Sequence, residues 1–155
     1  MSKQKKEFKK PQKTPVLSKV TRSLASHISS IVKDVSANAI FVYADALHEV
    51  QPEFKSSEHY KVFYVTRTPE EDLKQNMLKR NRLRVPNVPL TRMGQIKMAM
   101  FLALSQGLIH QNDTVVFLTG VAASGLLDTI MVMQVGNEFE IFQLPNGEDT
   151  LSSKI

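Results

Sequence analysis

Three separate runs of consecutive apolar residues constrain the fold of this chain more than any other feature. They are "NAIFVYA" (38–44), "YKVFYVT" (60–66) and the run inside "NDTVVFLTG" (112–120). A strand with one face in water alternates apolar and polar residues, whereas a strand covered on both faces is apolar throughout. The runs therefore predict central strands of a mostly parallel sheet that is covered on both faces by helices.

The segments between these runs show helical patterns. Apolar residues recur at steps of three and four from 17 to 35, and Thr14 followed by Pro15 predicts an N-cap with proline in the first turn. Residues 68–81 begin with acidic and end with basic side chains, which suits the helix dipole. Residues 92–109 predict a well-buried helix that Gly107 ends. A short helix is also expected within 47–58.

Two further strand signals complete the predicted sheet. Leu83–Val85 lies in a proline-rich stretch and predicts a short edge strand. Residues 129–135 and 138–144, joined by Gly-Asn, predict antiparallel strands of a hairpin. The expected fold is an α/β three-layer sandwich with a mostly parallel five-stranded sheet, whose last strand or strands are antiparallel.

The positive charge of the chain is confined to its first residues. Residues 1–14 hold six lysines and one glutamate, which accounts for the whole net charge of +5, so the remaining 141 residues are neutral with 14 basic and 14 acidic side chains. We expect a disordered basic tail (1–14), one α/β domain (15–145) and a polar C-terminal tail (146–155). Nucleic acid would have only the tail to bind.

Composition and motifs exclude several classes of protein. No apolar run approaches the length of a membrane span, and the absence of cysteine leads us to expect a cytoplasmic location. The four histidines are scattered without the spacing of a zinc motif. No phosphate-binding loop, dinucleotide fingerprint or nucleophile motif occurs, so the residues give no support for an enzyme, a metal site or a cofactor.

The candidate binding site lies where the predicted parallel strands end. Ligands of open α/β sheets bind beyond the carboxyl ends of the strands, and polar residues gather there in this sequence. The candidate ligand-binding residues are Asp45, Thr66, Arg67, Thr91, Arg92, Thr119, Gly120, Ser124, Gly125 and Asp128. The glycine-containing loop "TGVAASGLLD" (119–128) has two interpretations: its free amides hold an anion, or it merely leads the chain into the final strand.

Several segments of the amino-acid sequence resemble those of a known family. "YKVFYVTRT", "VPLTRMGQIKMAMFLALSQGLI", "NDTVVFLTG" and "SGLLDTIMVMQVG" resemble, in order and pattern, the C-terminal α/β domain of pyruvate kinase. The detailed wording is closer to a bacterial branch associated with DisA-type diadenylate cyclase proteins. The resemblance covers about residues 15–143, and it implies a five-stranded sheet and a non-catalytic role in ligand sensing.

The resemblance also implies an effector site built from two loops. The glycine loop is retained as Thr119, Gly120, Ser124 and Gly125, but "YADALHEV" replaces the phosphate-binding loop and puts Asp45 where a phosphate would lie. A carboxylate there repels a phosphate by roughly 1–4 kcal/mol. The expected ligand is therefore a small anionic or nucleotide-like molecule. Asp45 would accept hydrogen bonds from its donor groups, and Arg67 and Arg92 would hold its anionic group.

Two other classes of function stay open. The predicted hairpin 129–144 leaves an open sheet edge, which would suit a protein-interaction module such as a homodimer or a partner of a diadenylate cyclase. An enzyme, or a nucleic-acid binder that uses the basic tail, is the remaining alternative.

Overall fold

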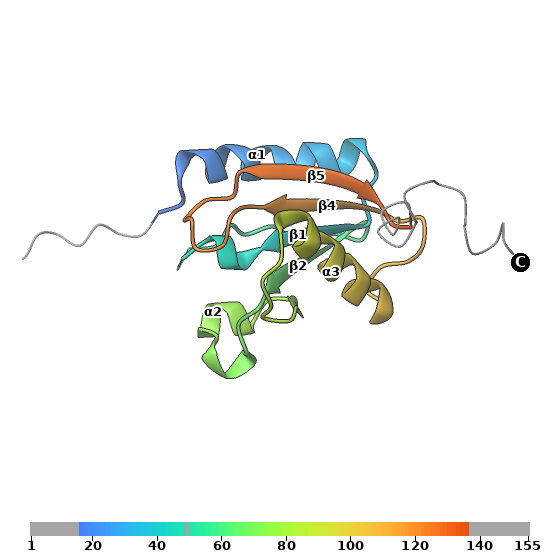
Figure 1. Cartoon of the computed structure of the whole chain (residues 1–155). Helices are drawn as coiled ribbons and strands as arrows, with labels where there is room; N and C mark the ends of the chain where they lie inside the picture. The colour runs from blue at the N-terminus through green and yellow to red at the C-terminus, as the bar shows by residue number, and fades with distance from the viewer. Residues whose placement is uncertain (1–15, 49, 137–155) are drawn as a thin grey trace, which may run out of the picture.

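A five-stranded sheet organises the protein, with α1 and α3 on opposite faces (Figure 1). The computed structural model describes residues 16–48 and 50–136. Its strands are β1 (Ala39–Tyr43), β2 (Lys61–Thr66), β3 (Arg82–Arg84), β4 (Thr114–Thr119) and β5 (Thr129–Gln134). They lie in the order β3-β2-β1-β4-β5, all parallel except β5, which is antiparallel to β4. The predicted fold class is confirmed.

The centre of the sheet is apolar on both faces, as its sequence predicts. All five residues of β1 are buried, and β2 and β4 are buried except at their first residues. Phe41 lies in register with Phe63 on one side and with Phe117 on the other. The ring of Phe41 stacks on both, with centroid distances of 5.4 and 4.8 Å. This row of rings fixes the register of the three central strands.

Capping groups mark the beginning of one long helix and the end of the other. Helix α1 (Lys19–Asp34) begins after Ser18, whose hydroxyl accepts from the amide of Thr21, so the N-cap is Ser18 and the prediction of Thr14 is wrong. Helix α3 (Arg92–Ser105) ends before Gly107, as predicted. Gly107 has a φ of +71°, and its amide donates to the carbonyl of Leu104, which is the turn that glycine favours after a helix.

Helix α3 is less buried than its composition predicts. Ile96, Ala99, Met100 and Ala103 are buried against the sheet. On the outer side, Phe101 is 53% and Met93 is 37% exposed. The apolar side chains that exceed one buried face therefore lie on the surface of the protein.

Two other predicted helices are wrong. Residues 68–81 hold only a 3₁₀ turn, Glu70–Asp72, and the short helix α2 (Gln75–Leu78). Met77 is the sole buried residue of these two pieces, so the charge pattern has no apolar stripe to support a longer helix. The described residues of 47–58, which are 47, 48 and 50–58, contain no helix, and Pro52 interrupts this segment.

Several predictions are shifted or fall outside the described residues. The edge strand β3 lies one residue before the predicted Leu83–Val85. The basic tail (1–14), the strand 138–144 with its Gly-Asn turn, and the polar tail (146–155) lie outside the described residues or at their limit. The domain limits predicted from composition stay predictions for that reason.

Candidate functional site

The loops that follow β1, β2 and β4 meet at one edge of the sheet. These three strands are mutually parallel, so their carboxyl ends lie side by side. The loop after β1 brings Asp45, the loop after β2 brings Arg67, and the loop after β4 is the glycine loop (119–128). Their backbones and side chains contact each other directly, as the hydrogen bonds described below show.

Asp45 is held by the end of β2. Its Oδ1 accepts from the hydroxyl of Thr66 at 2.6 Å, and its Oδ2 accepts from the amide of Arg67 at 2.7 Å. The Nε atom of Arg67 lies 3.5 Å from the same Oδ2. Thr66 in turn accepts from the amide of Thr68. The negative charge of Asp45 is therefore balanced within the protein, which weakens the repulsion that Asp45 would exert on a bound anion.

The glycine loop is bonded to the backbone around Asp45. The amide of Ala123 donates to the carbonyl of Asp45, and the amide of Gly125 donates to the carbonyl of Ala46, both at 2.8 Å. Gly125 has a φ of +84°, and a Cβ there would lie 3.1 Å from the ring of His48. Asp45, Arg67 and the glycine loop are thus brought together, as the sequence predicts.

Most amides in the second half of this loop are not free to hold an anion. Among residues 123–128, five amides donate to acceptors of the protein itself at 2.8–3.1 Å. The acceptors are the carbonyls of Asp45, Ala46, Thr119 and Val121 and the hydroxyl of Thr21. The interpretation of this part of the loop as an anion cradle is wrong, because folding has already satisfied its donors.

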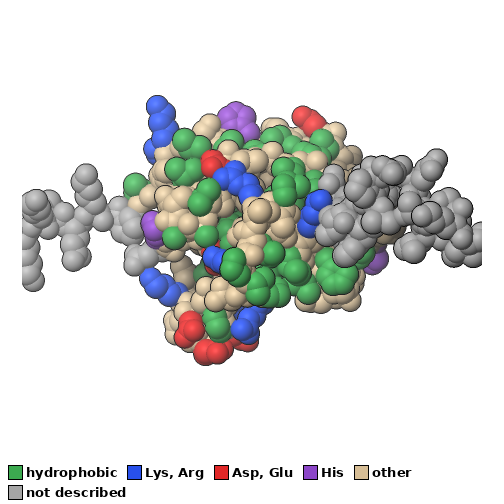
Figure 2. Space-filling model, viewed as in Figure 1, with side chains coloured by type: hydrophobic (Ala, Val, Ile, Leu, Met, Phe, Trp, Pro, Cys, Tyr) green, Lys and Arg blue, Asp and Glu red, His purple; other side chains and the backbone are tan. Residues whose placement is uncertain are grey.

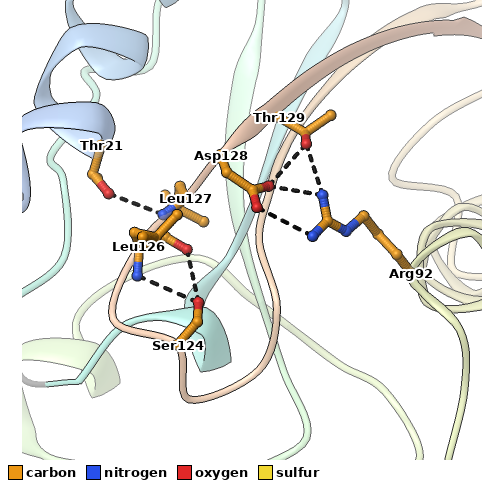
Figure 3. Close-up of polar contacts among 7 residues, drawn as sticks. All are labelled: Thr21, Arg92, Ser124, Leu126, Leu127, Asp128 and Thr129. Carbon is orange, nitrogen blue, oxygen red and sulfur yellow. Dashed lines mark hydrogen bonds and ion pairs between the residues drawn. The ribbon is translucent and has the colours of Figure 1, made fainter.

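Figure 3 shows how the end of the glycine loop is anchored to both long helices. The amide of Leu127 donates to the buried hydroxyl of Thr21 in α1 at 2.9 Å. The guanidinium of Arg92, in the first turn of α3, donates to both carboxylate oxygens of Asp128, at 2.7 and 3.2 Å, and to the hydroxyl of Thr129 at 2.8 Å. This loop therefore joins helices from opposite faces of the sheet.

The anchoring changes the roles of several predicted site residues. Arg92 and Asp128 neutralise each other, and the hydroxyl of Thr91 caps α3 by accepting from the amide of Gly94. Burial works to raise the pKa of Asp128, but the hydrogen bonds from Thr129 and Arg92 and the charge of Arg92 together lower that pKa. Arg92 thus has a structural partner, Asp128, that no local sequence pattern indicates.

The remaining three predicted residues also have local structural roles. Thr119 is 2% exposed at the end of β4. Gly120 must lack a side chain, because a Cβ there would collide with the carbonyl of Leu126. The hydroxyl of Ser124 donates to that same carbonyl at 3.2 Å.

Two cavities open on either side of Arg67. The first, which we call the Asp45 cavity, has a volume of about 460 Å³ and lies between the loop after β1 and the segment that carries α2. Figure 2 shows the molecule hollowed between this segment and the body. The second, which we call the Leu90 cavity, has a volume of about 530 Å³ and lies between the start of α3 and Gly120–Ala122.

The Asp45 cavity is lined mainly by polar side chains, many of which the sequence did not single out. Besides Asp45, Thr66 and Arg67, its polar lining includes His48, Gln51, Thr68, Asp72, Lys74, Asn76 and Asn87. Gln51, Asn76 and Asn87 lie in stretches of sequence without any motif. Their position depends on how the loops fold back over β2, which no local pattern indicates.

Buried polar atoms without a partner gather around these cavities. Within the described residues, the buried side-chain atoms without a hydrogen-bond partner are the hydroxyl of Tyr43, the Oε1 of Gln51 and the Nε of Arg67, which has only its ion-pair contact with Asp45. Gln51 and Arg67 line the Asp45 cavity, and Tyr43 lines a void of about 10 Å³ between the sheet and α3. Burial, together with the charge of Asp45, raises the pKa of Tyr43 against the opposing effect of Arg67. Such atoms are rare in folded proteins, and their clustering marks this edge as a functional candidate.

Metal binding and membrane insertion find no support in the described part of the chain. No three His, Asp or Glu side chains of residues 16–48 and 50–136 are grouped so that they could hold a metal ion. None of the helices in the same residues combines the length and the apolar character that a bilayer span requires.

Comparison with known proteins identifies the family. No curated protein matches the chain. A family model described as "Probable sensor domain DacZ_P" matches residues 21–142, which include every described strand. The match supports the association with diadenylate cyclase-related proteins, while the resemblance to pyruvate kinase stays a prediction. The chain belongs to the DacZ_P family, whose members are described as sensor domains.

Proposed function

We propose that this protein is a non-catalytic sensing domain that binds a small anionic or nucleotide-like molecule in the Asp45 cavity. The observation that carries the proposal is the pairing of an open cavity at the carboxyl edge of the sheet with two buried polar atoms that have no hydrogen-bond partner within the described residues, the Oε1 of Gln51 and the Nε of Arg67, the latter in ion-pair contact with Asp45 alone. The family's description as a sensor domain supports the same role.

The chemistry of the cavity suits a ligand with both donors and acceptors. Arg67 supplies positive charge, since its terminal nitrogens make no hydrogen bond within the described residues while its Nε faces Asp45. The amides of Asn76 and Asn87 can donate or accept, and the carboxylates of Asp45 and Asp72 accept only. A sugar hydroxyl or base amine near a carboxylate, with an anionic group near Arg67, fits this arrangement.

The sheet order supports the proposed kinship with the C-terminal domain of pyruvate kinase. Both the five strands and the antiparallel last strand are what that resemblance implies. A phosphate bound in the manner of that family does not fit here, because Asp45 stands in place of the phosphate-binding loop and most amides of residues 123–128 are already bonded within the protein. The proposed ligand is therefore of a different kind.

A thermal-shift panel tests this function. Nucleoside monophosphates, cyclic dinucleotides and phosphosugars are each added to the whole chain, and a ligand at one hundred times its Kd raises the unfolding free energy by about 2.7 kcal/mol. Arg67→Gln should weaken binding about tenfold or more, because a hydrogen bond to a charged group is lost. Asn87→Ala, an exposed cavity residue, should weaken it without altering the unliganded protein.

The control is Arg84→Gln, since Arg84 is exposed on β3 and does not line the Asp45 cavity. This variant should bind like the unmodified protein. If no compound of the panel moves the melting temperature, or if Arg84→Gln weakens binding as much as Arg67→Gln, the proposed function is wrong.

A second candidate function is a protein-interaction module. The observation that favours it is the position of β5 at the end of the sheet formed by the described residues, where Val132 is 44% exposed. A strand at the edge of a sheet has unpaired backbone groups that another chain can bond. The proposed partner is a second copy of this chain or an associated diadenylate cyclase.

A further inference from the structure

The Leu90 cavity differs in chemistry from the Asp45 cavity, although Arg67 lines both. Its walls are mostly apolar and come from Pro89 and Leu90 before α3 and from Val121 and Ala122 in the glycine loop. None of the described residues that line it is acidic, whereas Asp45 and Asp72 line its neighbour. Both cavities thus have access to the same cation but offer different surroundings.

Three exposed apolar side chains lie in or next to the segments that form this cavity. Val88, Met93 and Val121 are 42%, 37% and 56% exposed, and all three belong to, or directly adjoin, the two segments that form its walls. Figure 2 shows hydrophobic side chains gathered on the surface near α3. A ligand that covers apolar surface around a cavity removes it from water, which makes the free energy of binding more favourable.

Polar groups that could orient a ligand lie at two places in this cavity. The amides of Val121 and Ala122 make no hydrogen bond within the described residues, unlike those of residues 123–125. Gln95 is the one described residue that lines both the Leu90 cavity and the small void that Tyr43 also lines. The hydroxyl of Tyr43 is buried and has no hydrogen-bond partner within the described residues.

We infer that the Leu90 cavity is a second subsite, which takes a planar apolar ring of a ligand whose anionic group lies at Arg67. The inference rests on the proposed function and names the ligand class: an anion that carries a flat ring, such as a nucleoside phosphate or an aryl phosphate. The ring packs against Leu90 and Val121, and Gln95 bonds polar atoms on the edge of the ring. The rest of the ligand extends past Arg67 into the Asp45 cavity.

The test compares four probes that differ in the ring: inorganic phosphate, ribose 5-phosphate, adenosine 5′-monophosphate and 1-naphthyl phosphate. Affinities are measured by calorimetry on the whole chain, and the contacted residues by amide NMR shifts. The two probes with rings should bind about tenfold or more tightly than their partners without rings, because they cover apolar surface. They should also shift the amides of Gln95, Val121 and Ala122.

A matched pair of variants locates the effect. Val121→Ser removes apolar surface from the cavity and should weaken both ring-bearing probes about threefold or more while leaving inorganic phosphate unchanged. Val132→Ser, at another exposed valine that lies on β5, should change none of the four affinities. Tighter binding of the nucleotide than of 1-naphthyl phosphate would show that Gln95 reads the edge of the base.

The failure of this inference is distinguishable from failure of the proposed function. If ring-bearing and ring-free probes bind equally, and only amides around Asp45 and Asn87 shift, the Leu90 subsite is wrong and the Asp45 site stands. If no probe binds, the Leu90 subsite is wrong for phosphates. The thermal-shift panel described above then tests the sensing function separately.

Discussion

At the scale of single residues, hydrogen-bond partners decide which side chains are free to bind a ligand. Asp45, Arg92 and Asp128 each look like ligand contacts in the sequence, yet all three bond to neighbouring groups of the protein. Within the described residues, Gln51 keeps a buried oxygen without a hydrogen-bond partner, and the buried Nε of Arg67 has only its ion-pair contact with Asp45. The availability of a polar group, and not its type, therefore separates binding candidates from structural residues.

Substitution of Thr21 should destabilise the glycine loop and, with it, the folded protein. Thr21 is 0% exposed, and its hydroxyl oxygen accepts from the amide of Leu127 and from the hydroxyl of Ser18, both at 2.9 Å. Thr21→Val keeps the shape and removes the acceptor, so the Leu127 amide is left buried and unpaired. We expect a loss of about 1–3 kcal/mol in the free energy of unfolding, measured by urea denaturation.

Hydrogen exchange provides the control for this substitution. Thr21→Ser retains the acceptor and should preserve the slow exchange of the Leu127 amide, whereas Thr21→Val should accelerate it. An unchanged exchange rate in Thr21→Val would contradict the role assigned to this hydrogen bond.

At the scale of elements, the glycine loop is the part that connects the layers. It bonds to the 3₁₀ turn after β1, to the first turn of α1 and to the first turn of α3. Its glycines provide backbone geometry that its contacts require, since Gly120 faces the carbonyl of Leu126 and Gly125 has a positive φ. A ligand at this edge would therefore contact a loop that is tied to helices on both faces of the sheet.

The ion pair at the end of this loop should give stability a specific pH dependence. The pKa of Asp128 is lowered in the folded protein, so its contribution is present above the unfolded pKa of about 4 and is lost as the pH falls through the folded value. Asp128→Asn should cost about 0.5–1 kcal/mol at pH 7, because both groups are partly exposed. The difference from the unmodified protein should vanish in acid.

The measurement is the free energy of unfolding of both proteins from pH 7 down to pH 2. Glu71→Gln is the control, since Glu71 is exposed and makes no ion pair within the described residues. A difference for Asp128→Asn that persists unchanged at pH 2 would contradict the assignment.

At the scale of the whole molecule, the sheet presents two different edges. The carboxyl ends of β1, β2 and β4 form the edge that carries both cavities. Within the described residues the lateral edges are β3 and β5, and β5 is far in sequence from the loops after β1 and β2. Sensing and association, the two functions proposed, thus belong to separate parts of the surface and can be tested separately.

Association through β5 makes a simple prediction about size. A homodimer joined along this strand should have the mass of two chains by light scattering. Val132→Lys should reduce the mass to that of one chain, because a charged side chain disfavours edge-to-edge pairing. Ligand binding at the Asp45 cavity should survive that substitution. A monomeric mass at high concentration would count against the interaction module.

The sequence by itself determined the layered architecture and the location of the candidate site. Uninterrupted apolar runs can be buried only in central strands, and this is why β1, β2 and β4 were predicted at nearly their observed limits. Parallel strands end at a common edge, so Asp45, Arg67 and the glycine loop could be expected together. Both conclusions rest on patterns within single segments.

The tertiary structure alone decided which polar groups bond to each other. Arg92 meets Asp128 across 36 residues, and Thr21 meets Leu127 across 106, distances at which no periodicity carries information. The helix predicted over 68–81 also failed, because its charge order suits a helix dipole but, in its two short helical pieces, only Met77 is buried. Local patterns specify elements, whereas the pairing of donors and acceptors depends on how those elements pack.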